Sequence, residues 1–359
     1  MKIDIQKLVR KNILNLKPYS SARDEFEGEN GILLDANENP FGKLNRYPDP
    51  YQKEIKQKLS GINQISVENI FLGNGSDEVI DLAFRIFCEP GKDKVLTFSP
   101  TYGMYEVSAN INNVELINLE LNNDLQIDLE TLKPYLKDEN LKIIFICSPN
   151  NPTGNSMKNI KYILENFNGI VFIDEAYIDF SPEESFRYQI KNYPNLIVSQ
   201  TFSKAWGMAS VRVGIAYASK EIIKFYNKVK PPYNISQLNQ NAILDVLNDE
   251  NIKRVQENIK LILNEKKILI EKLKELSLVK IIFPTDANFV LIEVENADEI
   301  YQKLVDENVI VRNRNSVVKN CLRITVGSPE ENKKLIETLR EKCQAEALEA
   351  IYKNKFHKQ

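Results

Sequence analysis

Short apolar runs alternate with helical stretches over the first two thirds of the chain. The runs are rich in Val, Ile and Phe, a composition typical of strands that are buried on both faces. They occupy residues 95–98, 142–147, 170–174, 196–200 and 213–218. Helical periodicity marks residues 77–87 and 157–167. This alternation predicts an α/β fold with a mostly parallel sheet, helices on both faces of it, and a ligand site beyond the carboxyl ends of its strands.

The pattern changes after Pro231 and Pro232, where the alternation stops. The elements expected from there on are a long helical stretch over 236–276, a strand at 287–294, a helix at 297–307, strands near 309–312 and 321–326, and a closing helix that begins at Pro329. This order predicts a second, smaller α+β domain.

The same pattern divides the chain into three parts. Residues 1–31 are expected to form an N-terminal arm, because this segment is polar and we expect it to lie on the surface or on a partner subunit. Residues 32–240 are expected to form the large ligand-binding domain, and residues 241–359 the small C-terminal domain.

Composition and charge make several kinds of partner improbable. Of the 359 residues, 43% are hydrophobic and 27% charged, which is ordinary for a globular protein, and the formal net charge of -3 offers no pull toward nucleic acid or an anionic membrane. No apolar run approaches the roughly 18 residues that span a bilayer. The four cysteines stand far apart, so no metal site and no dithiol pair is expected. We expect a cytoplasmic protein that acts on small molecules.

A single histidine narrows the chemistry further. It is His357, third from the end of the chain in a basic stretch. Ser-His-Asp and Cys-His catalysis and histidine-based metal sites need an imidazole inside a folded site, which a histidine in this tail does not supply. Proton transfer near neutral pH must therefore use another side chain, and a lysine with a lowered pKa is available.

Glycine is scarce in this chain, so its placement is informative. Two of the 13 glycines stand in the sequence Leu-Gly-Asn-Gly-Ser-Asp-Glu at 72–78, which runs directly into a predicted helix. Gly75 permits a tight turn, and the amides of Ser76 and Asp77 would open the helix as an anion site suited to a phosphate. An ordinary capped helix is the alternative. The segment has neither the GK[ST] of a P-loop nor the GxGxxG of a dinucleotide-binding fold.

Two polar segments follow predicted strands. Ser-Pro-Asn-Asn-Pro-Thr-Gly at 148–154 predicts a rigid turn at the ligand edge, where two adjacent amides can donate hydrogen bonds into the site; a plain turn is the alternative. Asp174 ends a fully apolar strand, and a carboxylate buried there requires a cation or a protonated ring nitrogen unless it merely caps the next loop. Tyr177 adds a phenolic hydroxyl on the same side.

A lysine follows another predicted strand in the segment 199–207. Lys204 is flanked by small hydroxyl and aromatic side chains, an environment that lowers the pKa of an amine by desolvation. Such a lysine is a candidate to form a Schiff base, and Ser203 with Arg212 can hold a phosphate. Together with the strand-end carboxylate and the helix start, this set matches the needs of pyridoxal 5'-phosphate (PLP).

The motifs resemble those of a known family. They are Asp-Ala-Asn-Glu-Asn-Pro at 35–40, Asn-Arg-Tyr-Pro-Asp-Pro at 45–50, Thr-Tyr-Gly-Met-Tyr at 101–105, Phe-Ile-Asp-Glu-Ala-Tyr at 172–177 and Leu-Arg-Ile-Thr-Val-Gly at 322–327, beside the three segments above. With them the chain resembles the fold-type I PLP-dependent aminotransferases, and within these the histidinol-phosphate aminotransferases, from about residue 17 to residue 327.

The resemblance implies a role for individual residues at the cofactor. Lys204 would bind PLP covalently and then shuttle a proton, while Asp174 would keep the pyridine nitrogen protonated. The remaining implied contacts are Asn151 and Tyr177 at the ring oxygen, Tyr102 on the ring face, and Gly75, Ser76, Asp77, Thr201, Ser203 and Arg212 at the phosphate. Tyr47 would reach the phosphate from the neighbouring subunit, which makes a homodimer part of the implied site.

The resemblance also implies a substrate pocket and a reaction. Arg323 would bind the carboxylate of glutamate in one half-reaction and the phosphate of histidinol phosphate in the other, with Tyr19, Asn37 and Arg312 completing the pocket. The loop between the two arginines is short. The implied reaction converts L-histidinol phosphate and 2-oxoglutarate to imidazole-acetol phosphate and L-glutamate in histidine biosynthesis.

Three other activities would use much of the same sequence. An aromatic-amino-acid aminotransferase would share every cofactor residue, and a threonine-phosphate decarboxylase is a PLP lyase of very similar sequence. A PLP-fold regulator would need a further DNA-binding domain of roughly 60 residues, for which this chain has no spare stretch.

Overall fold

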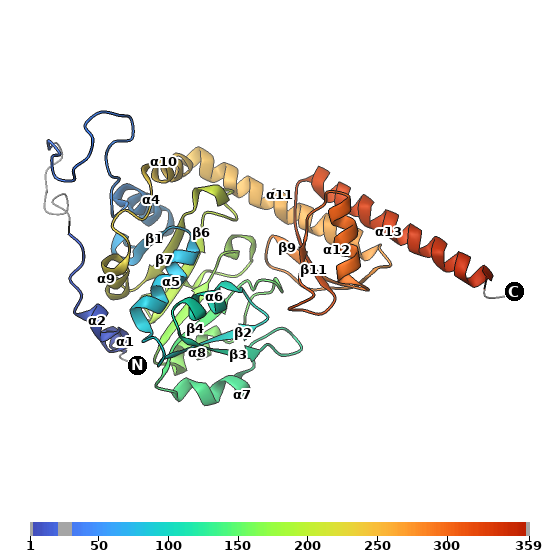
Figure 1. The fold of residues 1–359 in the computed structure, drawn as a ribbon, viewed down its shortest axis with the longest axis horizontal. Coiled ribbons are helices and arrows are strands. Elements are labelled where there is room, and N and C mark those ends of the chain that lie inside the picture. The colour runs from blue at the N-terminus through green and yellow to red at the C-terminus, as the bar shows by residue number, and fades with distance from the viewer. Residues whose placement is uncertain (1–2, 21–30, 357–359) are drawn as a thin grey trace.

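Two domains of unequal size make up the molecule in the computed structural model, which describes residues 3–20 and 31–356 and, in the last helix, side chains up to Cys343. The large domain lies on the left of Figure 1 and the small domain on the right, and the long helix α11 (Asp249–Lys274) runs from one to the other. The expected divisions near residues 31 and 240 stay a prediction. His357 lies outside the described residues.

The large domain is built on a seven-stranded sheet in the order β1-β7-β6-β5-β4-β2-β3. Strands β6, β5, β4, β2 and β3 run parallel to one another. Strand β7 runs antiparallel to its two neighbours, β1 and β6. Their bounds are β1 Ile70–Gly73, β2 Lys94–Ser99, β3 Glu115–Glu120, β4 Leu141–Cys147, β5 Ile170–Asp174, β6 Leu196–Thr201 and β7 Gly214–Ala218. The predicted α/β fold with a mostly parallel sheet is therefore confirmed.

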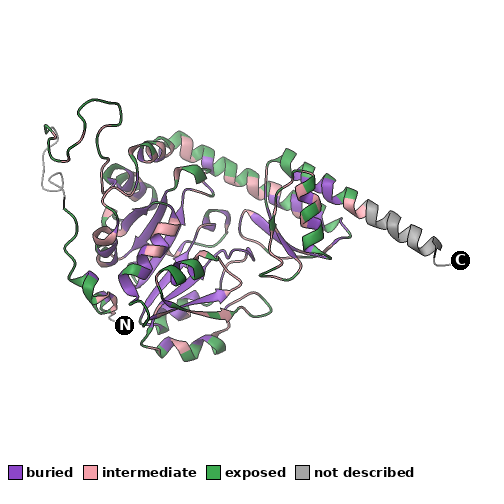
Figure 2. Ribbon diagram, in the orientation of Figure 1, coloured by how far each residue is buried: buried purple, intermediate pink, exposed green. Residues whose placement is uncertain are grey.

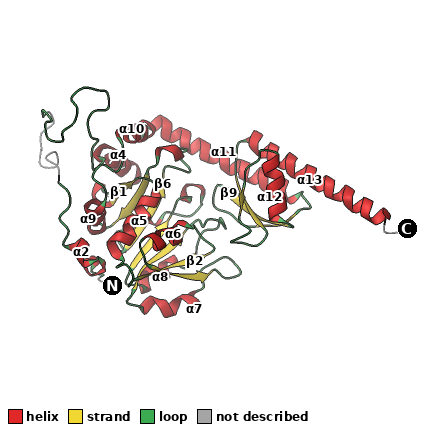
Figure 3. Ribbon diagram, in the orientation of Figure 1, coloured by secondary structure: helices red, strands yellow, loops and turns green. Residues whose placement is uncertain are grey.

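Helices cover both faces of this sheet, as Figure 3 shows. Helices α5 (Ser76–Phe87), α6 (Met104–Ile111) and α9 (Lys220–Val229) pack on one face with Phe145 and Phe172 of the strands. Helices α4 (Lys53–Asn63), α8 (Ile160–Asn166) and α10 (Gln237–Val246) pack on the other with Ile144 and Ile173. Because neighbouring residues of one strand enter opposite cores, each central strand is a continuous apolar run, drawn as buried in Figure 2.

Two strands of this sheet were not predicted. Strand β3 lies at an edge and exposes the polar residues Glu115, Asn118 and Glu120, so it shows no continuous apolar run. Strand β1 lies at the other edge, and its four residues are all buried. Four residues are too few for periodicity to distinguish a strand from the helices around it.

The small domain holds a four-stranded antiparallel sheet in the order β10-β11-β9-β8. Its elements are β8 Val279–Ile282, β9 Phe289–Val294, α12 Ala297–Asp306, β10 Arg312–Asn313, β11 Cys321–Thr325 and α13 Pro329–Phe356. Strand β8 was not predicted. The helical stretch expected over 236–276 is present as two helices, because the chain breaks between α10 and α11. The side chain of Asn248 accepts a hydrogen bond from the Asn251 amide and so caps the start of α11.

The beginning of the predicted arm is attached to the large domain. It forms two short helices, α1 (Ile5–Leu8) and α2 (Lys11–Leu14), whose residues Ile5 and Ile13 are buried in the core beside α5 and α9. A short helix, α7 (Leu129–Leu132), lies between β3 and β4. In the part of the chain that the structure describes, no helix combines the length and the apolar composition needed to cross a membrane.

A close contact between β7 and the start of α5 gives a test of this packing. A Cβ on Gly214 would lie 2.3 Å from the Ser76 backbone nitrogen, so Gly214→Ala must displace α5. We expect it to lower the free energy of unfolding by about 1–3 kcal/mol, the usual cost of overpacking. Urea unfolding would measure the loss. Gly61→Ala in α4, where a Cβ meets nothing within 4 Å, is the matched control and should cause no loss. Equal effects of the two substitutions would contradict this packing.

Candidate active site

One cavity lies at the carboxyl ends of β4, β5 and β6. Its lining combines the ends of these strands with the start of α5 and the loops that follow β5 and β6. The lining residues are Ser76, Asp77, Tyr102, Cys147, Asn151, Asp174, Ala176, Tyr177, Thr201, Ser203, Lys204 and Arg212. The structure therefore brings into one place residues that the sequence offers as candidates from segments up to 136 positions apart (212 minus 76). Cys147 and Ala176 were not among those candidates.

Asp174 carries the buried negative charge of this cavity. It is the last residue of β5, and only 2% of its surface is exposed. Burial raises the pKa of its carboxyl group to about 6, although two hydrogen bonds act in the opposite direction. One comes from the Tyr105 hydroxyl to Asp174 Oδ2 at 2.9 Å, and the other from the Ala176 amide to Oδ1 at 3.1 Å. No ion pair among the described residues includes Asp174.

Tyr105 is a residue of the site that the sequence analysis missed. It lies in α6, is fully buried, and stacks on Phe145 of β4 with ring centroids 5.0 Å apart. This packing leaves its hydroxyl directed at Asp174. The available signal was the second tyrosine of the motif at 101–105, but only its first tyrosine, Tyr102, was interpreted.

The carboxylate that follows Asp174 faces a different set of partners. Glu175 is buried and accepts hydrogen bonds from the Ser185 hydroxyl, from the Phe186 amide at 2.7 Å and from Gln200 Nε2 at 2.8 Å. Burial raises its pKa to about 7. These contacts attach the loop after β5 to β6, and so fix the position of Asp174 from the side opposite the cavity.

The start of α5 forms the opposite end of the cavity. Gly75 precedes the helix with a φ of 77°, and no side chain caps the first turn. The Arg212 guanidinium lies against it, since a Cβ on Gly75 would be 2.6 Å from Arg212 Nη2. Arg212 Nη1 also approaches Ser203 Oγ at 3.4 Å. Helix amides, a guanidinium and a hydroxyl thus converge, as phosphate binding requires.

The Asp77 side chain orders two neighbours at this end. Its Oδ1 accepts a hydrogen bond from the Tyr102 hydroxyl at 3.0 Å, and its Oδ2 pairs with Arg212 Nη2 at 3.3 Å. Asp77 was predicted only as a donor of its backbone amide. The structure adds that its carboxylate holds Tyr102 and Arg212 in place.

Lys204 lies between the two ends. It follows β6, stays partly open to solvent, and has its Nζ 5.5 Å from the centre of the Tyr177 ring. The pKa of its ammonium is lowered, first by burial and then by the charge of Arg323, while Asp174 acts in the opposite direction. A lysine in this setting gives up its proton more readily than a solvated lysine.

Arg323 reaches this site from the small domain. It lies in β11, donates a hydrogen bond to Asn151 Oδ1 and places its guanidinium 5.2 Å from the centre of the Phe289 ring. Phe289 in turn meets the Tyr177 ring edge to face at 5.1 Å. The contact with Asn151 connects the small domain to the turn after β4.

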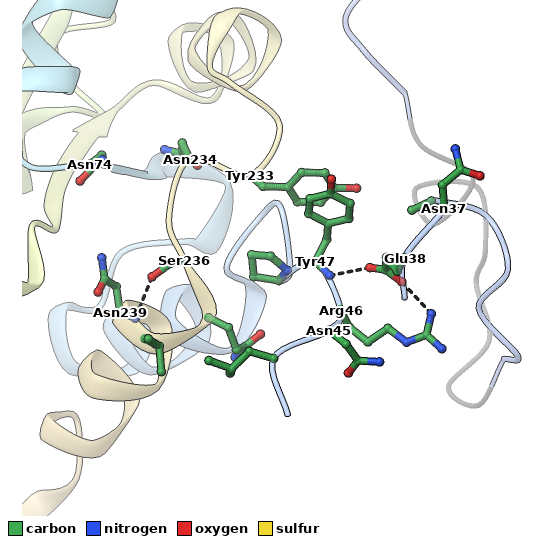
Figure 4. A pocket seen from close by; sticks show the side chains of 15 residues that line it. Asn37, Glu38, Asn45, Arg46, Tyr47, Asn74, Tyr233, Asn234, Ser236 and Asn239 are labelled. Carbon is green, nitrogen blue, oxygen red and sulfur yellow. Dashed lines mark hydrogen bonds and ion pairs between the residues drawn. The ribbon is translucent and has the colours of Figure 1, made fainter. Parts of the chain in front are cut away.

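Other predicted site residues do not line this cavity. Asn37 and Tyr47 line a separate cavity of about 640 Å³, shown in Figure 4, where Tyr47 stacks on Tyr233 with ring centroids 4.4 Å apart. Tyr19 is 68% exposed, and Arg312 lies exposed on β10. The predicted roles of these four residues stay predictions.

The sequence and the fold of this chain are similar to those of known proteins. The family model of class I and II aminotransferases matches residues 27–339. A histidinol-phosphate aminotransferase of Christiangramia forsetii is 53% identical, covering 94% of this chain and 98% of the relative, and one of Parabacteroides distasonis is 51% identical with the same coverage. The crystal structure of the enzyme from Clostridium acetobutylicum has a TM-score of 0.76 and 26% identity, covering 84% of this chain and 92% of that one.

The chain belongs to the class I and II aminotransferases. Members of this family are PLP-dependent, so this aminotransferase is a PLP enzyme of fold type I.

The residues present in the cavity of this aminotransferase fit PLP. Asp174 is a buried carboxylate that forms no ion pair with the described residues, which suits the protonated pyridine nitrogen. The uncapped start of α5 with Arg212 suits the phosphate, and Lys204 suits the aldehyde. Tyr102, Asn151, Tyr177, Thr201 and Ser203 complete the donor set around these groups.

The hydrogen bond from Tyr105 to Asp174 gives a test of the electrostatics of this aminotransferase. Tyr105→Phe removes a donor that favours the carboxylate, so we expect the pKa of Asp174 in the cofactor-free protein to rise above about 6. Infrared spectra of the carboxyl band, recorded against pH, would measure the shift. Tyr226→Phe is the matched control, because Tyr226 is equally buried but bonds to the Val79 carbonyl outside the site. An unchanged midpoint in Tyr105→Phe would contradict the assignment.

Proposed function

We propose that this aminotransferase moves an amino group from L-histidinol phosphate to 2-oxoglutarate, which yields imidazole-acetol phosphate and L-glutamate in L-histidine biosynthesis. The observation that carries the proposal is the 53% identity to a histidinol-phosphate aminotransferase over 94% of this chain. Arg323 of the small domain supports it, because it donates to Asn151 at the edge of the cavity and a guanidinium can bind either a phosphate or a carboxylate through paired oxygens.

The cofactor and the protein side chains would contribute different parts of the chemistry. When bound, PLP supplies an electron sink that makes the proton on the substrate Cα acidic. Lys204 is the residue proposed to take this proton and return it, because its lowered pKa favours the neutral amine. Asp174 is proposed to hold a proton at the ring nitrogen that faces it.

The remaining contacts orient the reacting groups. Asp77 keeps Tyr102 beside the cavity, and Arg212 with Ser203 and the first amides of α5 would hold the cofactor phosphate. Arg323 would hold the anionic group of each substrate. In the structure Arg323 donates to Asn151 Oδ1, and this contact uses one guanidinium N–H and the acceptor of the amide, so the other donors of both side chains remain suited to the proposed roles.

A homodimer is part of the proposal. The segment from Ile32 to Tyr47 exposes large apolar side chains, namely Ile32 at 91%, Leu34 at 87%, Phe41 at 84%, Leu44 at 63% and Tyr47 at 50%. Exposed apolar surface of this extent is typical of an interface. We propose that this segment covers the cavity of a second copy and that Tyr47 reaches its cofactor phosphate. We further propose a cytoplasmic location, without nucleic-acid or membrane partners.

Covalent attachment of the cofactor gives the first prediction for this function. Lys204→Ala should leave no cofactor linked to the protein after borohydride reduction, as judged by mass spectrometry. Its transamination rate should fall by about 10²- to 10⁴-fold, the usual contribution of a general acid–base group. Lys253→Ala, at an exposed position of α11, is the control and should retain both properties. Full activity of Lys204→Ala would remove this residue from the mechanism.

A comparison of substrates separates the proposal from its rivals. With 2-oxoglutarate as acceptor, we expect kcat/KM for L-histidinol phosphate to exceed that for L-phenylalanine at least ten-fold. L-threonine phosphate should release no carbon dioxide. A preference for phenylalanine would identify an aromatic-amino-acid aminotransferase, and carbon dioxide release without a keto acid would identify a decarboxylase.

A further inference from the structure

Three arginines share one face of the small sheet. Arg312 of β10 lies directly opposite Arg323 of β11, and residues opposite each other in an antiparallel pair point to the same face. Arg314 continues the pairing, because its amide donates to the Cys321 carbonyl at 2.9 Å. Alternate residues of an extended segment share a face, so Arg314 lies on the same face as Arg312.

Contacts on the other face support this orientation. Asn313 and Asn315 alternate with the arginines, and both donate to the Asp298 carboxylate of α12, at 2.7 and 2.8 Å. The face that carries the arginines is the one that meets the large domain, because Arg323 donates to Asn151 there. The hairpin formed by β10 and β11 therefore directs the side-chain amides of Asn313 and Asn315 to α12 of the small domain, and its guanidinium groups to the face on which the active site lies.

The three positive charges have no acidic ion-pair partner among the residues that the structure describes. None of the ion pairs found among the described residues includes Arg312, Arg314 or Arg323. The Nε atoms of Arg314 and Arg323 are buried without a hydrogen-bond partner among the same residues. Burial lowers the pKa of Arg314, and the charges of Arg323 and then Arg312 lower it further. Like charges opposite each other destabilise a sheet, so this cluster is suited to an anion from outside the chain.

We propose that Arg314 is a specificity-determining residue, which binds the phosphate of the amino substrate together with Arg323 and Arg312. This inference rests on the proposed function and adds a residue to its substrate site. A phosphate carries up to two negative charges and offers more acceptor oxygens than a carboxylate, so a third guanidinium favours the phosphate-bearing substrate over glutamate. Arg314 was not among the residues predicted from the sequence.

Steady-state kinetics of the PLP-loaded enzyme test the specificity. Arg314→Gln should raise KM for L-histidinol phosphate about ten-fold or more, and should change KM for L-glutamate in the reverse reaction less than about two-fold. Arg314→Lys, which keeps the charge, should restore part of the difference. Lys319→Gln is the matched control, since Lys319 is exposed in the same hairpin. An equal rise of both KM values, or no rise, would overturn the proposal.

A binding measurement that needs no turnover makes the test independent of the reaction. Inorganic phosphate should raise the Tm of the PLP-loaded wild type, whose cofactor phosphate site is already filled, and should raise that of Arg314→Gln less. If the wild type does not transaminate histidinol phosphate but still shows this Arg314-dependent shift, the anion site stands and the proposed substrate fails. If both proteins respond equally to phosphate, Arg314 does not bind it.

Discussion

The burial of one carboxylate at the end of a central strand constrains the rest of this site. Asp174 ends β5 with strands on both sides of it, where water cannot solvate its charge. The protein partly offsets this cost through the Tyr105 hydroxyl and the Ala176 amide, and still the pKa stays at about 6. A buried anion in this condition is stabilised by a cation, and a protonated pyridine nitrogen supplies one. Asp174 would therefore hold the pyridine nitrogen at its own end of the cavity.

The other groups of the site follow from the same sheet. Parallel strands bring their carboxyl ends to one edge, so Lys204 after β6 and the turn after β4 lie beside Asp174 although the chain separates them. The start of α5 lies at this edge because Gly214 has no side chain, so that β7 can pack directly against the backbone of Ser76. The small domain adds positive charge through Arg323, so that one cavity combines a buried anion with several cationic groups.

Patterns within single segments of the sequence were sufficient to predict the fold class and several candidate site residues. The apolar runs that end at Cys147 and Asp174, and the segment that carries Lys204, each contain both a strand and the polar residue that follows it, so the fold class could be predicted from the sequence, as could the segments that meet at the cavity. Edge strand β3 and the four-residue β1 have no such pattern. Tyr105 and Arg314 could not be placed, because their importance depends on contacts across the fold, with Asp174 in one case and with Arg323 and Arg312 in the other. The family resemblance implied that Tyr47 and Asn37 belong to the site, whereas the structure of the single chain places both residues at a separate cavity.

We expect one cavity to carry out both halves of an amino-group exchange with histidinol phosphate as donor. A single-turnover absorbance titration of the PLP-loaded protein, with L-histidinol phosphate and no keto acid, tests it most directly. We expect the visible band of the bound cofactor to fall while the pyridoxamine form appears, and 2-oxoglutarate then to restore the band. A band that does not respond to histidinol phosphate would contradict the substrate assignment, and the lack of any visible band in the protein supplied with PLP would contradict the cofactor site itself.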